Sequence, residues 1–381
     1  MDAPAAGVGS PVLRSVPGQE AAVSFLLQAL HRPHHAYLLA GPEGGGKQKV
    51  ARAFAAALLC ERGGCGECRA CGLALAERHP NVFVVEPEGR DIHVETVRQE
   101  VWHPAYLTAP EPGRKVFVIR EADRLNPAAA DVLLKVLEEP PADSVLLLLS
   151  ARPDELPETV VSRCHVVGFL PLAEPFVAEA LRAEGVDARE ALLAARLAGG
   201  NLGRARRIAT AGEGMAFRGA AREALALVAE GPPGALAAAD VVLEAADRYR
   251  DALKDDLQKE LVPFLDARGR VEESFRGVVR RLEDRHKRRL RRAERDFVDW
   301  VLLAASTLLR DRILLAAGGD ATWRVNLDVD AEAEPGLRHL SPAAAGRALG
   351  RIEETRADVA DETNLNLRLV LEGAFLALAA A

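Results

Sequence analysis

The residues best suited to chemistry form a glycine-rich loop at Gly41–Gln48. Its spacing follows the phosphate-binding pattern G-x-x-x-x-G-K-[ST], in which backbone N–H groups and the lysine hold phosphate oxygens. Gln48 departs from the pattern, because it replaces the Ser or Thr hydroxyl that binds Mg²⁺. A glycine-rich turn that binds nothing is the alternative. The candidate phosphate-binding residues are Gly41, Gly44, Gly46, Lys47 and Gln48.

A second support for a metal is missing after the strand expected at Val116–Ile119. Hydrolytic proteins with such a loop carry an Asp there that supports Mg²⁺, whereas Arg120 stands at this position here. At about 4 Å and an effective dielectric of ~20, a divalent ion beside a guanidinium costs ~8 kcal/mol. Glu121 has the place of a water-activating carboxylate, and Asp123 supplies the missing Asp only if the alignment slips. Together with Gln48, Arg120 predicts a site without Mg²⁺-dependent hydrolysis.

Four of the five cysteines lie close together, with the spacing C-x4-C-x2-C-x2-C. In a cytosolic chain such clustering favours a metal over disulfides. Four thiolates suit a tetrahedral Zn²⁺ without an open position, which is typical of a structural site. An iron–sulfur cluster and a metal-free group of thiols are the alternatives. The predicted ligands are Cys60, Cys65, Cys68 and Cys71, whereas Cys164 is expected to be a small core residue.

The elements around these residues alternate between strand and helix as far as residue 170. The apolar run His35–Ala40 and the Ala-rich stretch Lys47–Cys60 are expected to be the strand and the helix on either side of the loop. This alternation predicts an α/β fold, with a parallel sheet covered by helices on both faces. Further strands are expected at Val82–Val85, Val116–Ile119, Val145–Leu149 and Val166–Phe169, and further helices at Val94–Trp102 and Asn126–Glu139.

The pattern changes to helix after Leu172. Ala173–Ala211 is expected to be a small helical unit, and the rest of the chain is helical again and rich in Ala and Leu. Within it, Arg280–Arg292 holds eight Lys or Arg residues, with Glu283 and Asp284 interspersed. We therefore favour a solvated helical face for this segment over a contact with DNA phosphates.

Length and composition bound the remaining choices. The 381 residues predict two or three domains, and 49% of them are hydrophobic, which is enough for several cores. The net charge of −7 argues against a basic protein that coats nucleic acid. Met1–Pro17 lacks the pattern of a secretory signal, and no apolar stretch approaches the ~20 residues that span a membrane. A cytoplasmic protein is expected.

Several of these passages together resemble the delta-prime family of bacterial DNA polymerase III clamp-loader subunits, which are AAA+ proteins. They are the degenerate loop, the four-cysteine insert after its helix, Leu133–Pro141 with the sequence LLKVLEEPP, and Ser162–Cys164 with the sequence SRC. The last two are the most specific, because they occur together and in order. The resemblance is close as far as the helical unit that ends at Ala211 and loose beyond it.

This resemblance implies an AAA+ P-loop domain at 1–172 with a zinc module at 60–71, a helical lid at 173–211 and a helical collar at 212–381 that joins subunits into a ring. It also implies that Arg163 acts in trans, as an arginine finger on ATP held by a neighbouring motor subunit. From the sequence alone, an ion pair at the start of a strand is the simpler role for Arg163. The implied partners are the gamma/tau motor subunits, delta, the sliding clamp and, through the complex, primed DNA.

Two features depart from the family pattern. The gap between Cys60 and Cys65 is short, and Gly203 stands where active clamp-loader ATPases have a sensing arginine, with Arg204 one position later. The expected function is therefore a non-hydrolysing accessory subunit with structural Zn²⁺, in which nucleotide binding without turnover stays open. An active AAA+ ATPase is the first alternative. A zinc-dependent nucleic-acid-binding protein with a vestigial loop is the second, although the sequence shows no aromatic stacking platform.

Overall fold

The computed structural model of the protein describes residues 9–87, 91–209, 213–264, 271, 276–330, 334–361 and 365–380. They separate into two compact units, Met1–Val177 with Gly199–Gly203, and Ala178–Ala198 with Arg204–Ala381. The three-part division stays a prediction, and its boundary between residues 211 and 212 lies outside the described residues. Within the described ranges, no helix is long and apolar enough to cross a membrane.

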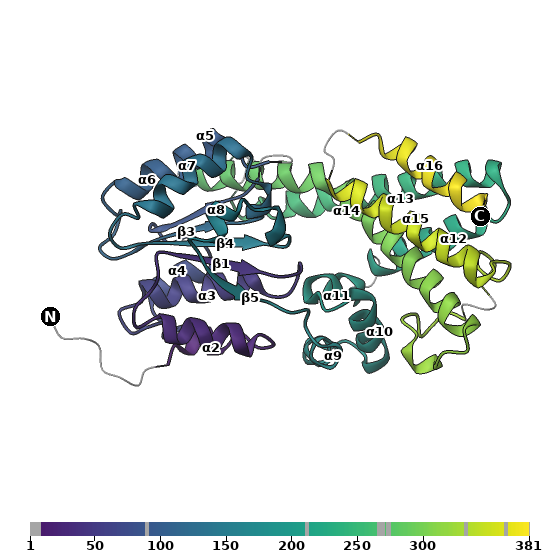
Figure 1. Ribbon diagram of the computed structural model, residues 1–381, viewed down its shortest axis with the longest axis horizontal. Coiled ribbons are helices and arrows are strands. Elements are labelled where there is room, and N and C mark those ends of the chain that lie inside the picture. The colour runs from purple at the N-terminus through teal and green to yellow at the C-terminus, as the bar shows by residue number, and fades with distance from the viewer. Residues whose placement is uncertain are drawn as a thin grey trace. The chain divides into compact units, whose positions relative to one another are not determined.

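A five-stranded sheet in the order β2-β3-β4-β1-β5 forms the centre of the first unit (Figure 1). All neighbouring strands are parallel, and β3 and β4 are buried along their whole length, which is why their sequences are almost continuously apolar. The expected strands are confirmed, with ends that shift by one residue. The strands are β1 (Ala36–Ala40), β2 (Val82–Val85), β3 (Lys115–Ile119), β4 (Ser144–Ser150) and β5 (His165–Gly168).

Helices cover both faces of this sheet, as the alternating sequence predicts (Figure 1). Along β1, Tyr37 and Leu39 pack into a core with α1–α4, whereas Ala36 and Leu38 pack on the other face with α5, α7 and α8. The α/β fold class is therefore confirmed. The helices of this unit are α1 (Pro11–Arg14), α2 (Glu20–Ala29), α3 (Lys47–Leu59), α4 (Arg69–Leu75), α5 (Val94–Val97), α6 (His103–Tyr106), α7 (Pro127–Glu138) and α8 (Glu158–Val161), with the short turns η2 (Ala122–Arg124) and η3 (Pro153–Glu155).

The helix expected at Val94–Trp102 is wrong in detail. A π-helical turn, η1 (Arg98–Trp102), interrupts it and leads into α6. Pro104 supplies the physical reason, because it has no N–H and its ring would clash with the carbonyl of residue 100 in a regular helix. In the wider turn, the N–H of His103 donates instead to the carbonyl of Arg98.

The second unit is mainly helical. Its core is formed by α12–α16 and includes Phe297, Leu302 and Phe375, each almost fully buried. The charged segment Arg280–Arg292 lies in α14, where Arg280 and Lys287 are exposed, as a solvated face requires. The helices after the sheet are α9 (Glu174–Ala183), α10 (Ala188–Ala198), α11 (Leu202–Ala209), α12 (Glu213–Val228), α13 (Pro232–Lys259), α14 (Arg276–Ala316), α15 (Pro342–Asp361) and α16 (Leu367–Ala379), with η4 (Val262–Phe264) and η6 (Ala321–Trp323).

Candidate nucleotide site and cysteine cluster

The glycine loop connects β1 to α3, as the phosphate-binding pattern requires. Gly41 has a φ of +148°, and a Cβ there would lie 2.2 Å from the carbonyl oxygen of Phe169. Gly44 has a φ of +73°, and its Cβ would lie 1.9 Å from Cγ of Asn201. Both glycines are therefore required by backbone conformation and by neighbouring atoms. Gly46, with a φ of +88°, directly precedes α3.

Lys47 begins α3 and keeps its amine within the loop. Its Nζ donates to the carbonyls of Gly41 and Pro42, the second at 2.8 Å. Burial lowers the pKa of Lys47, and the nearby carboxylates of Glu43 and Asp123 partly oppose this shift. The structure thus brings the predicted phosphate-binding residues together, although the lysine amine is bonded to the loop's own carbonyls.

The two residues that depart from the hydrolytic pattern touch each other. Oε1 of Gln48, in the amide orientation that satisfies its hydrogen bonds, accepts from Nε of Arg120 at 2.7 Å. The same guanidinium donates to both carboxylate oxygens of Glu77 at 2.5 Å and pairs with Glu86. Arg52 also pairs with Glu77, at 2.8 Å. A network of hydrogen bonds and ion pairs thus extends from the end of the loop to Glu77.

Arg120 is a largely buried member of this network, with a side chain 18% exposed. Burial lowers its pKa, and Glu77 opposes this shift only in part; an arginine nevertheless stays protonated in proteins. For Glu77, burial raises the pKa, but Arg52 and Arg120 outweigh it, so the net shift is downward. A fixed positive charge therefore lies beside Gln48, where the hydrolytic pattern calls for ligands of Mg²⁺.

Both acidic residues after β3 are engaged by neighbouring groups. Glu121 has a φ of +49° and pairs with Nε of Arg124 at 2.9 Å. Oδ1 of Asp123 accepts from the hydroxyl of Ser150 at 2.7 Å and from the N–H of Ala151 at 3.2 Å. The carboxylate of Asp123 is thus engaged at the end of β4, and Arg120 holds the position directly after β3, as the sequence indicates.

Arg163 lies between α8 and β5 and is tied to neighbours in its own unit. Its Nη2 donates to Oε1 of Glu138 at 2.7 Å, and its Nη1 donates to the carbonyl of Thr159 at 2.8 Å. The side chains of Arg163 and Glu138 are 36% and 51% exposed. The SRC and LEEPP motifs are thus joined through this pair, and the guanidinium is accessible from solvent.

The four clustered cysteines are brought together at the end of α3 and the start of α4. Their sulfurs all lie within 4.8 Å of one another, and Cys60 Sγ is 3.7 Å from Cys65 Sγ and 3.6 Å from Cys68 Sγ. A tetrahedral Zn²⁺ with bonds of ~2.3 Å places its sulfurs ~3.8 Å apart. The donor set and its spacing therefore fit a metal such as Zn²⁺. Cys164 is buried elsewhere, as expected, and burial raises its pKa to about 12.

Two glycines allow the short gap before the second cysteine. Gly63 and Gly64 have φ values of +66° and +92°, and the N–H of Gly63 donates to the carbonyl of Cys60 at 2.8 Å. Backbone N–H groups also point at the sulfurs. The N–H of Glu67 lowers the pKa of Cys65 to about 6, whereas burial raises that of Cys71 to about 12. The tight loop expected from the sequence is thus formed by left-handed backbone.

Two further residues contact the loop and are not predicted from the sequence. Nε2 of Gln19 donates to the carbonyls of Gly45 at 2.8 Å and Leu170 at 2.7 Å, and its Oε1 accepts from the N–H of Leu170 at 3.4 Å. Asn201 packs against Gly44. No local signal marks either residue, because both act on segments far away in the sequence. Gly203 and Arg204, which follow Asn201, lie in α11.

Comparison with known proteins shows what the first unit is similar to. A family model described as DNA polymerase III, delta subunit, matches residues 18–173. The DNA polymerase III subunit delta' of Pseudomonas aeruginosa is 46% identical over 178 residues, and that of Bacillus subtilis is 33% identical over 169 residues. Over residues 18–173 the chain is thus similar to the delta' subunits of DNA polymerase III. The resemblance expected from the SRC and LEEPP motifs is thereby confirmed.

The delta-prime match covers only part of each protein. It includes 44% of this chain in both cases, with 53% of the Pseudomonas protein and 51% of the Bacillus protein. The chain thus matches about half the length of these relatives. Among solved structures, a DNA polymerase III gamma subunit-related protein from Thermotoga maritima aligns over 94% of this chain and 99% of its own, with 15% identity and a TM-score of 0.41.

Proposed function

We propose that the chain is a non-hydrolysing clamp-loader subunit of a cytoplasmic DNA polymerase III. Its similarity to delta' subunits over residues 18–173 supports the setting. The observation that carries the proposal is the contact between Gln48 and Arg120. This contact replaces both protein supports of Mg²⁺ with an amide and a guanidinium, so the loop keeps its shape without the means to hydrolyse ATP.

The loop acts mainly as architecture in this proposal. Lys47 bonds to the carbonyls of Gly41 and Pro42, Gln19 bonds to Gly45, and Asn201 packs against Gly44. The loop is thus held by residues of its own chain. An active ATPase, the alternative from the sequence, is disfavoured because a guanidinium opposes a divalent cation at close range.

Arg163 supplies the catalytic contribution that we propose, as a finger on ATP bound by a neighbouring gamma/tau-type subunit. Its present partner, Glu138, is half exposed, and exposed ion pairs contribute only about 0–1 kcal/mol. Breaking this ion pair so that Arg163 can reach a phosphate therefore costs little free energy. The planar, permanently charged guanidinium is suited to a developing charge on the γ-phosphate.

The four-cysteine cluster is proposed to hold one structural Zn²⁺. Cys60, Cys65, Cys68 and Cys71 would be the ligands, and four thiolates leave no open position for substrate. Bound metal would fix the end of α3 against the start of α4. The proposed partners of the assembly are gamma/tau, delta, the sliding clamp and primed DNA.

The decisive experiment is a reconstitution with partner subunits. The chain alone should show no Mg²⁺-dependent ATP turnover. With Arg163→Ala, the clamp-stimulated ATPase of the complex should fall by about 10³-fold or more, the range for arginine fingers, while size-exclusion chromatography shows an intact assembly. Arg78→Ala is the matched control, because Arg78 is exposed and has no ion pair among the described residues. Unchanged ATPase with Arg163→Ala would remove the finger, and turnover by the chain alone would remove the inert loop.

A further inference from the structure

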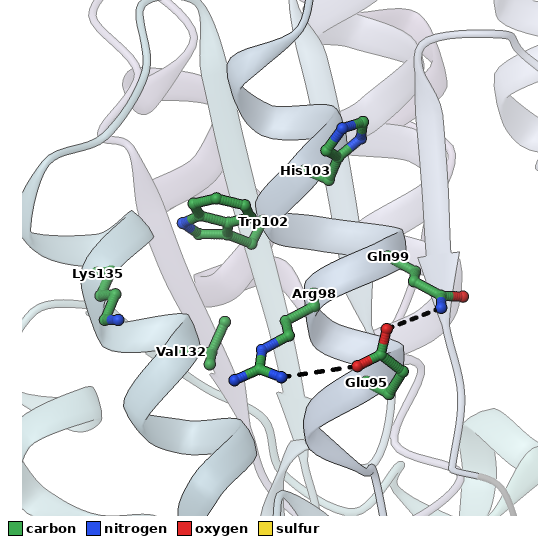
Figure 2. A pocket seen from close by; sticks show the side chains of 7 residues that line it. All are labelled: Glu95, Arg98, Gln99, Trp102, His103, Val132 and Lys135. Carbon is green, nitrogen blue, oxygen red and sulfur yellow. Dashed lines mark hydrogen bonds and ion pairs between the residues drawn. The ribbon is translucent and has the colours of Figure 1, made fainter.

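A second concave site lies on the first unit, between α7 and the segment from α5 to α6 (Figure 2). Its cavity has a volume of about 500 Å³, within the range of about 300–1,000 Å³ that is usual for ligand sites. Its lining includes Arg98, Trp102, Val132 and Lys135. None of these belongs to the glycine loop or the cysteine cluster, and the proposed function does not use them.

Trp102 gives this cavity an open aromatic surface. Trp102 is 40% exposed, whereas Val132 on α7 is buried. In Figure 2 the indole projects toward α7, the helix that carries Lys135 and Val132. Its ring contacts that of Tyr106, at 5.8 Å between centroids. A large indole left open beside an apolar side chain is suited to covering a flat ring.

The polar groups around Trp102 are available to a ligand. Among the described residues, neither the amine of Lys135 nor the indole N–H of Trp102 has a hydrogen-bond partner. Arg98 pairs with Glu95 at 3.7 Å, and both side chains are more than half exposed. An exposed ion pair of this kind contributes about 0–1 kcal/mol, so a ligand can break it at little cost in free energy. Two cations thus line the same cavity as the indole, whose own N–H is a further donor.

The backbone beneath the cavity is also unusual. Arg98 and Trp102 are the two ends of the π-helical turn η1, and such turns occur frequently at functional sites. Figure 2 shows that both side chains leave this turn toward α7. The turn therefore sets a cation and an indole on one side of the cavity, opposite Lys135.

We propose that this cavity binds a nucleotide, with the base against Trp102 and the phosphate at Arg98 and Lys135. Stacking on an aromatic side chain accepts any base, and cations beside the ring bind the phosphate by charge-assisted hydrogen bonds. A free nucleotide and an unstacked nucleotide of a single DNA strand share this chemistry. The site is separate from the glycine loop and does not depend on it.

The test uses the full-length chain in EDTA, which removes metal-dependent binding at the glycine loop. Titration calorimetry measures the affinity for ATP, and fluorescence anisotropy measures that for a short single-stranded oligothymidylate. Trp102→Ala should weaken binding roughly tenfold or more, as expected for a lost stack, and Trp102→Phe should keep most of it. Trp323→Ala is the matched control, because Trp323 is 71% exposed and lies outside the cavity. Circular dichroism verifies that each variant is folded.

The outcomes separate the two sources. ATP binding that Trp102→Ala weakens and Lys47→Ala leaves unchanged identifies a free nucleotide. A single strand that binds more tightly than ATP, and competes with it, identifies the strand. Binding that is lost with Lys47→Ala and kept with Trp102→Ala belongs to the glycine loop and overturns the proposal. Absence of binding by both ligands, or full affinity in folded Trp102→Ala, overturns it as well.

Discussion

Gln48 and Arg120 lie in direct contact, with Oε1 of Gln48 2.7 Å from Nε of Arg120. They come from α3 and from the end of β3, and each replaces a residue that supports Mg²⁺ in hydrolytic relatives of this loop. The two changes are therefore one structural feature. The guanidinium of Arg120 places a fixed positive charge where Mg²⁺ would lie, and the carboxylates of Glu77 and Glu86 neutralise this charge.

This contact predicts a measurable coupling between Gln48 and Arg120. Arg120→Ala should destabilise the first unit by about 1–3 kcal/mol, because it removes the partner of largely buried carboxylates. Gln48→Ala should cost less than about 1 kcal/mol. In a double-mutant cycle measured by urea unfolding, the coupling energy should be about 1 kcal/mol. Strictly additive effects would show that the two side chains do not interact in solution.

The cysteine cluster predicts one zinc per chain. Cys71→Ser should abolish zinc in the purified protein and destabilise the first unit, because a four-thiolate site loses its geometry with one ligand. Cys164→Ala is the control, since Cys164 is equally a free buried cysteine but lies outside the cluster. It should keep the full zinc content. Elemental analysis by mass spectrometry measures this, and iron or no metal in the native chain would contradict the assignment.

The sequence predicts most of what local patterning determines. Buried strands and the glycine loop each leave a signal within a few residues, and the structure shows both. The close spacing of four cysteines likewise predicts their cluster. The π-helical turn is not predicted from the sequence. Its cause, Pro104, acts on a carbonyl one turn earlier, where the residues themselves look like those of an ordinary helix.

Contacts between residues far apart in the sequence are not predicted from local patterns. The sequence shows that Gln48 and Arg120 each depart from the hydrolytic pattern, but their contact depends on how α3 packs on the sheet. Gln19 and Asn201 reach the loop only through tertiary structure. The cavity at Trp102 is missed for the same reason, since it needs α7 beside η1.

Three neighbouring histidines predict a loss of stability in mild acid. Burial lowers the pKa of His35, and neighbouring His34 and His165 lower it further; the ring of His34 lies 4.0 Å from His35 and 4.1 Å from His165. Because the folded pKa is below the unfolded value of 6.5, the unfolded chain binds more protons there. Stability should therefore fall as the pH drops below about 6.5.

The histidine prediction is checked by urea unfolding at pH 7.5 and pH 5.5 in parallel. His35→Gln should lose less stability than the native chain between these two pH values, because it removes the group that must stay neutral. A comparison of differences is needed, since the cysteine cluster also responds to pH. An equal loss in both proteins would contradict the role of His35.

The entry to the loop predicts an unusually costly glycine substitution. In Gly41→Ala, the new Cβ would meet a backbone oxygen, that of Phe169, at 2.2 Å, on top of a positive φ. Gly185 is the control, because it has a φ of +92° and no atom within 4 Å of its Cβ position. Gly185→Ala should cost about 1–2 kcal/mol from conformation alone. Gly41→Ala should cost at least about 1 kcal/mol more in thermal unfolding, and equal costs would contradict the close approach.

Gln19 is predicted to stabilise the loop although it lies outside the phosphate-binding motif. Its buried amide makes three hydrogen bonds, to Gly45 and to both backbone groups of Leu170. Gln19→Ala leaves these groups without their partner and should cost about 2–3 kcal/mol. Gln28→Ala is the control, since Gln28 is exposed on the following helix, α2, and surface changes usually stay within about 0.5 kcal/mol. Hydrogen exchange gives a local readout, because the amide of Leu170 should exchange faster in Gln19→Ala and at the native rate in Gln28→Ala. If exchange at Leu170 is unchanged in both, the loop does not depend on Gln19.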